Sequence, residues 1–378
     1  MMNTRPSLLS PVSLGDLHAP NRVFMAPLTR SRAKQPGDIP WAMNAEYYAQ
    51  RATSGLIIAE ATPVCPEGKG YAFTPGIWTD EQAEGWKLVT DRVHAAGGRI
   101  WLQLWHVGRV SHVALQPNGQ KPVAPSAVRA QSQTYIDDTY GRADTSEPRA
   151  LETDEVPKVI EQFRHGATLA KAAGFDGVEV HGANSYLLDQ FCRDGTNLRD
   201  DEWGGPIENR TKLGIEVARA VAEVWGVGRV GYRISPFNEA NDLKDSTPDE
   251  TFGYLADKLG ELGLAYLHAV ERPLGDPSAG LADANERFAR LANTFRAAGG
   301  GGYIANCGYT PELGQEAVAS GYADAVAFGK LFISNPDLPE RIRRDGPYRD
   351  WDRDTFYGGG PVGYTDQPPL AEPAWSSE

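Results

Sequence analysis

The sequence has few cysteines, an excess of acidic over basic residues and no long apolar run. Its 378 residues include three cysteines, Cys65, Cys192 and Cys307, which stand far apart and form no C-x-x-C pair. This number and spacing exclude a disulfide framework and an iron–sulfur cluster held by four thiolates. Such cysteine usage is typical of a reducing compartment, so we expect a cytoplasmic protein.

The charge balance also restricts the possible partners. There are 37 Lys and Arg residues against 50 Asp and Glu, a formal net charge of −13. This charge argues against nucleic acid and anionic membrane surfaces as partners. No apolar stretch reaches membrane-spanning length, and the first residues have no basic segment followed by an apolar one. We therefore expect neither a membrane segment nor a targeting signal.

Short apolar segments recur along the chain at regular intervals. Their apolar character is continuous rather than alternating, as in parallel strands covered on both faces. The eight segments are Arg22–Ala26, Leu56–Ala61, Arg99–Leu104, Gly177–His181, Arg229–Ile234, Tyr266–Val270, Gly302–Ala305 and Ala325–Phe328.

Amphipathic helices are predicted between these segments from their start signals. Thr79 and Gln82 form a capping box, and Thr247-Pro248 with Glu250 combines an N-cap, an N1 proline and an N3 acid. Thr310-Pro311 and Asn335-Pro336 repeat the cap-then-proline pattern.

Eight strand–helix units predict an α/β fold, a (β/α)₈ TIM barrel formed by one domain over residues 1–378. A doubly wound sheet is the alternative, but no G-x-G-x-x-G follows the first strand. Leu8–His18 is expected to form an N-terminal hairpin. The long loop after the third strand, Val107 to Glu152, has the length of a lid or binding segment. Residues 349–378 are expected to be an irregular tail on the barrel.

The fourth strand ends in the most distinctive stretch, His181-Gly-Ala-Asn184-Ser-Tyr186. An imidazole and an amide can both donate to one carbonyl oxygen, and a phenol can give up a proton. Taken alone, these residues could equally satisfy loop backbone. In a barrel, however, catalytic residues collect at the carboxyl ends of the strands, and the other strand ends also carry polar groups.

Those other ends suit a flat, phosphorylated cofactor. They include Thr29, Gln103 and Arg233, together with the aromatic Trp105. Asn306-Cys307-Gly308 and Gly329-Lys330 follow strands seven and eight, where barrels usually bind phosphate. No carboxylate pair or His/Asp cluster suggests a metal, and no serine nucleophile elbow is present. Lys330 is the only lysine that a Schiff-base aldolase could use.

The chain resembles the Old Yellow Enzyme family of FMN-dependent ene-reductases over nearly its whole length, and it is similar to the bacterial N-ethylmaleimide and pentaerythritol tetranitrate reductase type. The resemblance rests on specific motifs: Ala26-Pro27-Leu28-Thr29-Arg30, Gln103-Leu104-Trp105, His181-Gly182-Ala183-Asn184 with Tyr186, Asp201-Glu202-Trp203-Gly204-Gly205 with Glu208-Asn209-Arg210, and Ile333-Ser334-Asn335-Pro336-Asp337-Leu338.

The resemblance implies an enzyme that binds FMN tightly but non-covalently at the barrel mouth. FMN would be reduced by NADPH or NADH and would then pass hydride from N5 to an activated alkene, such as an α,β-unsaturated carbonyl or nitro compound. His181 and Asn184 would bind the substrate oxygen, and Tyr186 would donate the proton. The pocket would be shaped by Trp105, Tyr71 and Tyr357. The cofactor would be held by Ala26, Pro27, Thr29, Ala61, Gln103, Arg233, Asn306, Cys307, Gly308, Gly329 and Lys330.

Two positions depart from the family pattern. Lys330 stands where Arg is common, which keeps the charge but loses the bidentate fork. Cys307 stands where many relatives have Gly, so it would serve the phosphate through its backbone N–H. Thr29, by contrast, follows the branch of the family that has Thr rather than Cys at the flavin.

Other functions remain open alternatives to the ene-reductase. A 2,4-dienoyl-CoA reductase type would need an iron–sulfur cluster, which three scattered cysteines exclude. A flavin-binding protein or a flavin reductase with a different acceptor would not need Tyr186. A phosphosugar isomerase or aldolase on the same fold would need a lysine or carboxylate base that these strand ends lack. The natural substrate, the choice between NADPH and NADH, and a monomeric or homodimeric state do not follow from the sequence.

Overall fold

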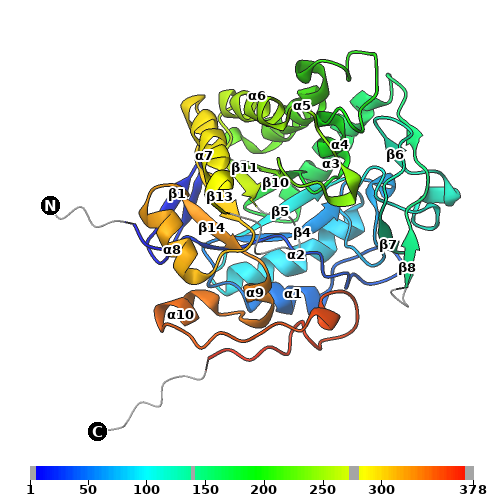
Figure 1. Cartoon of the computed structure of the whole chain (residues 1–378). Coiled ribbons are helices and arrows are strands. Elements are labelled where there is room, and N and C mark those ends of the chain that lie inside the picture. The colour runs from blue at the N-terminus through cyan, green and yellow to red at the C-terminus, as the bar shows by residue number, and fades with distance from the viewer. Residues whose placement is uncertain (1–5, 138–140, 272–280, 371–378) are drawn as a thin grey trace, which may run out of the picture.

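Eight parallel strands close into a barrel in the computed structural model (Figure 1), which describes residues 6–137, 141–271 and 281–370. Each barrel strand pairs with the next barrel strand along the chain, and the last strand, β14, pairs with the first, β3, to close the barrel. The predicted barrel and all eight predicted strands are confirmed. The strands are β3 (Val23–Met25), β4 (Ile57–Pro63), β5 (Ile100–Trp105), β10 (Gly177–Gly182), β11 (Val230–Ile234), β12 (Tyr266–Val270), β13 (Tyr303–Asn306) and β14 (Ala325–Phe328).

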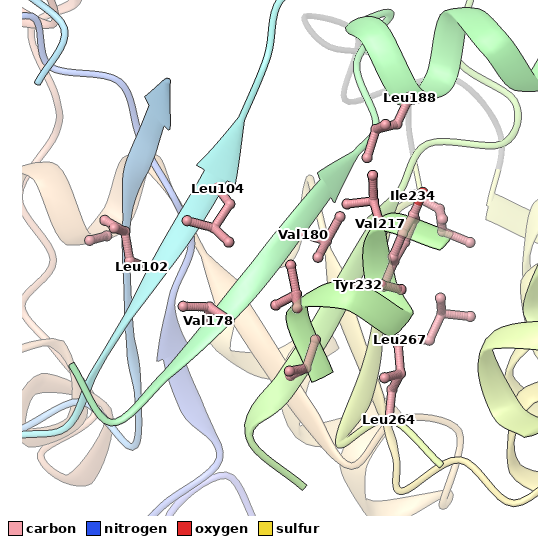
Figure 2. Packing of buried hydrophobic residues seen from close by; sticks show 14 of the residues in the cluster. Leu102, Leu104, Val178, Val180, Leu188, Val217, Tyr232, Ile234, Leu264 and Leu267 are labelled. Carbon is pink, nitrogen blue, oxygen red and sulfur yellow. The ribbon is translucent and has the colours of Figure 1, made fainter. Parts of the chain in front are cut away.

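Alternate side chains of each strand face outward and pack against the surrounding helices. Figure 2 shows Val178 and Val180 of β10 beside Tyr232 and Ile234 of β11, near Val217 of a covering helix. All five belong to one buried apolar cluster. The helices are α1 (Ala42–Ala49), α2 (Asp80–Ala95), α3 (Val156–Ala172), α4 (Leu187–Cys192), α5 (Ile207–Trp225), α6 (Pro248–Glu261), α7 (Leu281–Ala297), α8 (Pro311–Ala319), α9 (Lys330–Ser334) and α10 (Leu338–Arg343).

The amino-terminal end of the barrel is filled by apolar side chains and closed by a hairpin. Trp101 and Tyr266 stack inside it, with ring centroids 5.2 Å apart. Gly177 and Gly231 leave room for them, since a Cβ at either glycine would lie 2.1–2.3 Å from these rings. The expected hairpin is confirmed as β1 (Val12–Leu14) and β2 (Leu17–Ala19), and it packs against the same cluster. Because apolar side chains fill the amino-terminal end of the barrel, a functional site is expected at its carboxyl end.

Helices begin at three of the four predicted positions. Thr79 forms the capping box with Gln82 at the start of α2, and the Thr310 side chain accepts a hydrogen bond from Leu313 N–H at the start of α8. Thr247 does precede α6, but its side chain makes no cap hydrogen bond.

The Asn335 prediction is wrong. Asn335 follows the last residue of α9, and Asp337 is the N-cap of α10. The Asn335 side chain instead donates to the backbone oxygens of Leu331 and Arg349, and it accepts from Arg349 N–H. These bonds hold the start of the tail against the end of α9. The Asn335 side chain therefore connects two segments and does not cap a helix N-terminus.

The long loop after β5 contains short elements of its own. Two small sheets are formed by β6 (Val123–Ala124) with β9 (Arg149–Ala150) and by β7 (Gln133–Tyr135) with β8 (Arg142–Asp144). The described part of the tail, 349–370, is irregular apart from one 3₁₀ turn at Arg353–Thr355; the rest of the predicted tail, 371–378, lies outside the described residues. No helix in the described part of the chain is long and apolar enough to cross a membrane.

Candidate active site

The side chains that face into the barrel become polar toward its carboxyl end. Along β10 the inward positions are Gly177, Glu179 and His181, and along β5 they end in Gln103 and Trp105. His181 lies beside Arg233 of β11 in the strand register. Strand alternation thus brings several of the predicted site residues together at one mouth.

The turn after β10 places Asn184 and Tyr186. Asn184 and Ser185 both adopt left-handed backbone conformations, with φ of 58° and 68°. The turn is fixed from below, because Asn184 N–H donates to Ser235 Oγ (2.7 Å) and Ser185 N–H donates to Asp189 Oδ2 (2.9 Å). Asp189 is in turn held by a buried ion pair with Arg193 at 2.8 Å. Strained residues held by their surroundings are typical of functional sites.

Tyr186 lies among aromatic rings. Its ring meets Trp105 and His181 edge to face, with centroids 4.9 Å and 5.1 Å away. Its hydroxyl lies 3.2 Å from that of Tyr71, whose ring stacks on Trp105 at 5.8 Å. The four side chains come from three separate parts of the chain and form one aromatic cluster at the barrel mouth.

Burial determines the protonation states of the titratable side chains in this aromatic cluster. Burial, with help from Arg233 and His268, lowers the pKa of His181 well below its ordinary value, so the imidazole is neutral. His181 Nδ1 accepts from Ala183 N–H at 3.3 Å, which leaves the proton on Nε2. Burial also raises the pKa of Tyr186 well above its ordinary value and that of Tyr71 to about 12. Both phenols therefore remain protonated at neutral pH.

Two buried side chains inside the barrel, Glu179 and His268, support the mouth although the sequence analysis did not name them as site residues. Gln103 Nε2 donates to Glu179 Oε1 at 2.7 Å, and His268 Nδ1 donates to Glu179 Oε2 at 2.8 Å. Burial favours the acid form of Glu179, but His268 and Arg233 outweigh it and lower the pKa. Glu179 is therefore an anion that orients Gln103. The signal in the sequence was a glutamate inside an apolar strand, two residues before His181.

Arg233 has the donor pattern expected at the edge of a flavin. Its Nη2 donates to Asn306 Oδ1 at 2.6 Å, while its Nε is buried without a hydrogen-bond partner among the described residues. Burial lowers the pKa of Arg233 and Glu179 raises it, and a guanidinium stays charged at neutral pH in either case. A buried cationic donor calls for an acceptor, which the electron-rich edge of FMN would provide.

The ends of β3 and β4 contribute smaller groups to the same mouth. Ala26, Pro27 and Ala61 are buried, and Thr29 is half-buried. The Ala26 side chain packs in the apolar base, and its N–H donates to Phe328 O.

The predicted phosphate residues lie on two adjacent loops. Cys307 and Gly308 follow β13 with φ of 83° and 78°, a pair of left-handed residues of the kind that forms anion-binding turns. The Asn306 side chain connects the ends of β13 and β14, because its Nδ2 donates to Ala327 O at 2.6 Å. Gly329 precedes α9, and the exposed Lys330 begins it with Nζ 5.4 Å from the Trp351 ring centre.

Tyr357 is brought to the mouth by the tail. Arg30 and Arg32, which sequence reasoning left without a role, donate to backbone oxygens of residues 355–363, and Gly358 N–H donates back to Arg30 O. Tyr357 is 43% exposed, and its ring lies 5.6 Å from that of Tyr135 in the long loop. Tyr357 is thus an exposed side chain and not part of the buried aromatic cluster around Tyr186.

Metal ligation has no support in the described residues, where no group of three or more His, Cys, Asp or Glu side chains could hold an ion.

Comparisons with known proteins agree with this geometry. Residues 7–348 match the model of the "NADH:flavin oxidoreductase / NADH oxidase family". The chain is 46% identical over 368 residues to 12-oxophytodienoate reductase 1 of Oryza sativa subsp. japonica, covering 97% of this chain and 93% of that protein. Morphinone reductase in complex with tetrahydroNAD superposes with a TM-score of 0.90 at 50% identity, covering 97% and 98% of the two chains.

A third similar structure is the Old Yellow Enzyme homologue from Zymomonas mobilis, with a TM-score of 0.89, 42% identity, and coverage of 97% of this chain and all of that one. The family match spans most of the chain, and the relatives far exceed the identity at which family membership is secure. The chain therefore belongs to the Old Yellow Enzyme family and is an NAD(P)H:flavin oxidoreductase.

Proposed function

We propose that the protein is an FMN-dependent ene-reductase that reduces the activated C=C bond of α,β-unsaturated carbonyl compounds, with nitroalkenes as a second substrate group. Its reductant would be NADPH or NADH, used in a ping-pong cycle. The observation that carries the proposal is the pairing of a neutral His181, protonated on Nε2, with a protonated Tyr186 whose ring lies 5.1 Å away.

The two groups suit opposite tasks in one reaction. A neutral imidazole N–H and the Asn184 amide, which follows in the strained turn, can hydrogen-bond a carbonyl or nitro oxygen and withdraw electron density from the double bond. A phenol with a raised pKa keeps its proton until a carbanion-like centre takes it. Trp105 and Tyr71 exclude water from this proton transfer by packing around Tyr186.

The remaining residues would hold FMN, which supplies hydride when bound and reduced. Arg233 would offer its unpartnered Nε to the pyrimidine edge, beside a Gln103 oriented by Glu179. Thr29, Ala26, Pro27 and Ala61 would line the flavin ring. The phosphate would lie against Asn306, Cys307, Gly308, Gly329 and Lys330.

The alternative is a flavin reductase with a different electron acceptor. It would use the same cofactor residues, but it would have no use for a proton donor. The raised pKa of Tyr186 and its enclosed position favour the ene-reductase.

An anaerobic spectrum separates the two functions. We expect the purified protein to be yellow, to bleach with NADPH and to recover its colour when 2-cyclohexenone is added. A protein that bleaches but stays bleached with enones and nitroalkenes would be a flavin reductase with another acceptor. A protein that takes up no FMN would contradict both.

A further inference from the structure

A buried carboxylate outside the proposed catalytic pocket is held by three tyrosine hydroxyls. Glu271 directly follows β12 and is 6% exposed. Its Oε1 accepts hydrogen bonds from the hydroxyls of Tyr303 and Tyr322, both at 2.6 Å, and its Oε2 accepts one from Tyr309 at 2.5 Å. Such phenol–carboxylate bonds are charge-assisted and therefore strong.

The tyrosines remain donors over a wide pH range. Burial, reinforced by the Glu271 carboxylate, raises the pKa of Tyr303 and Tyr322 well above the ordinary value. Their rings also pack edge to face with centroids 5.7 Å apart. Two donors on one oxygen and a third on the other leave the carboxylate little freedom to rotate.

The third donor connects this cluster to the loop after β13. Tyr309 directly follows Cys307 and Gly308, the two residues with left-handed backbone. That conformation is unfavourable for a residue with a side chain, so Cys307 needs support from its surroundings. The bond from Tyr309 to Glu271 ties down the carboxyl-terminal side of this turn.

The amino-terminal side of the turn is fixed as well. Glu271 N–H donates to Asn306 O at 3.0 Å, and Arg233 Nη2 donates to Asn306 Oδ1 at 2.6 Å. Glu271 therefore contacts both flanks of the turn, through its backbone on one side and its side chain on the other.

We propose that Glu271 is a positioning residue for the phosphate-binding turn at Cys307 and Gly308. The hydroxyls of Tyr303 and Tyr322 fix the orientation of its carboxylate. The carboxylate in turn holds Tyr309, and therefore the backbone of the turn, through the hydrogen bond from the Tyr309 hydroxyl. The inference rests on the proposed FMN site, because the turn is assigned there to the FMN phosphate.

The test compares two flavins that differ only in the phosphate. Fluorescence quenching gives the dissociation constants of FMN and riboflavin for the full-length protein stripped of flavin, as wild type, Glu271→Gln and Tyr309→Phe. Since each variant removes a hydrogen bond that involves a charge, we expect FMN binding to weaken by about tenfold or more in both. Riboflavin binding should change by less than about twofold, because riboflavin makes no phosphate contact.

A matched control and a rescue make the result specific. Tyr254→Phe removes a half-buried phenol on α6, whose ring lies 5.6 Å from Lys258 Nζ, and should leave the dissociation constants of both flavins unchanged. Adding Cys307→Gly to Tyr309→Phe should restore part of the FMN affinity, because glycine adopts the left-handed conformation without strain. Unchanged FMN affinity in both variants, or equal loss of FMN and riboflavin, would overturn the proposal. Failure of the wild type to bind FMN would instead remove the proposed function itself.

Discussion

At the scale of single residues, burial decides which protonation state each group of the mouth adopts. His181, Tyr186 and Tyr71 all titrate away from their ordinary ranges, and in each case burial is the largest cause. The imidazole loses its extra proton, whereas the phenols keep theirs. The pocket thus holds two different neutral donors close together, one suited to binding an oxygen and one to giving up a proton.

Replacing the phenol should separate the two halves of the catalytic cycle. We expect Tyr186→Phe to leave flavin reduction by NADPH within about twofold of wild type. Reduction of 2-cyclohexenone should slow by about 10²-fold or more, the usual contribution of a general acid. Anaerobic stopped-flow absorbance measures each half-reaction separately.

The matched control is Tyr71→Phe, which removes the hydroxyl 3.2 Å from that of Tyr186 but keeps the proton donor. It should slow the alkene half-reaction less than Tyr186→Phe does. Equal slowing of both half-reactions by Tyr186→Phe would take this residue out of the proton-donor role.

At the scale of elements, the rim of the pocket is assembled from parts of the chain that are distant in sequence. Arg30 and Arg32 follow β3, yet they hold the tail at residues 355–363. Arg32 also lies 4.5 Å over the Tyr364 ring. A planar guanidinium with five donors can serve several backbone oxygens at once, which lysine cannot.

Loosening this anchor should affect the pocket without removing the cofactor. We expect Arg32→Lys to keep FMN bound and to raise the KM for 2-cyclohexenone several-fold, because Tyr357 loses its fixed position. Hydrogen exchange should be about tenfold faster in residues 355–363 and unchanged in β10. Faster exchange with an unaltered KM would show that Tyr357 does not shape the substrate pocket.

The elements themselves could be predicted well from the sequence. The eight strands were visible because parallel strands buried on both faces are continuously apolar. Most of the candidate site residues were proposed from the strand ends, whereas Tyr71 and Tyr357 were proposed only from the family resemblance. Asn335 was misassigned because the same Asn-Pro pair suits a helix start and a helix end, and only its bonds to residues 331 and 349 distinguish the two. Contacts of Glu179 with His268, or of Glu271 with three tyrosines, join distant parts of the chain and have no local signal.

At the scale of the whole molecule, several ionisable groups are buried together in and around the barrel. His106, His181 and His268 are each 2% exposed or less. Burial lowers the pKa of all three, that of His106 to about 3. The folded protein therefore keeps the imidazole of His106 neutral under conditions in which the unfolded chain would protonate it.

This difference predicts how stability depends on pH. A histidine in the unfolded chain titrates near pH 6.5. Above that pH, protonation of His106 in the unfolded chain does not lower the free energy of unfolding. As the pH falls from about 6.5 toward 3, the unfolded chain binds a proton that the folded one does not. The free energy of unfolding then decreases by up to about 1.4 kcal/mol per pH unit for this residue.

Replacing His106 with a side chain that does not titrate should remove its share of the acid sensitivity. We expect His106→Gln to have a shallower slope of unfolding free energy between pH 6 and 4, measured by urea titration of the flavin-loaded protein. His18→Gln, at an exposed histidine, is the matched control and should run parallel to the wild type. Because Gln lacks the imidazole that accepts from Gly108 N–H, the variant starts from lower stability at pH 7, so only the slopes are compared. Parallel curves for His106→Gln and wild type would mean that the buried imidazole is not a source of acid instability.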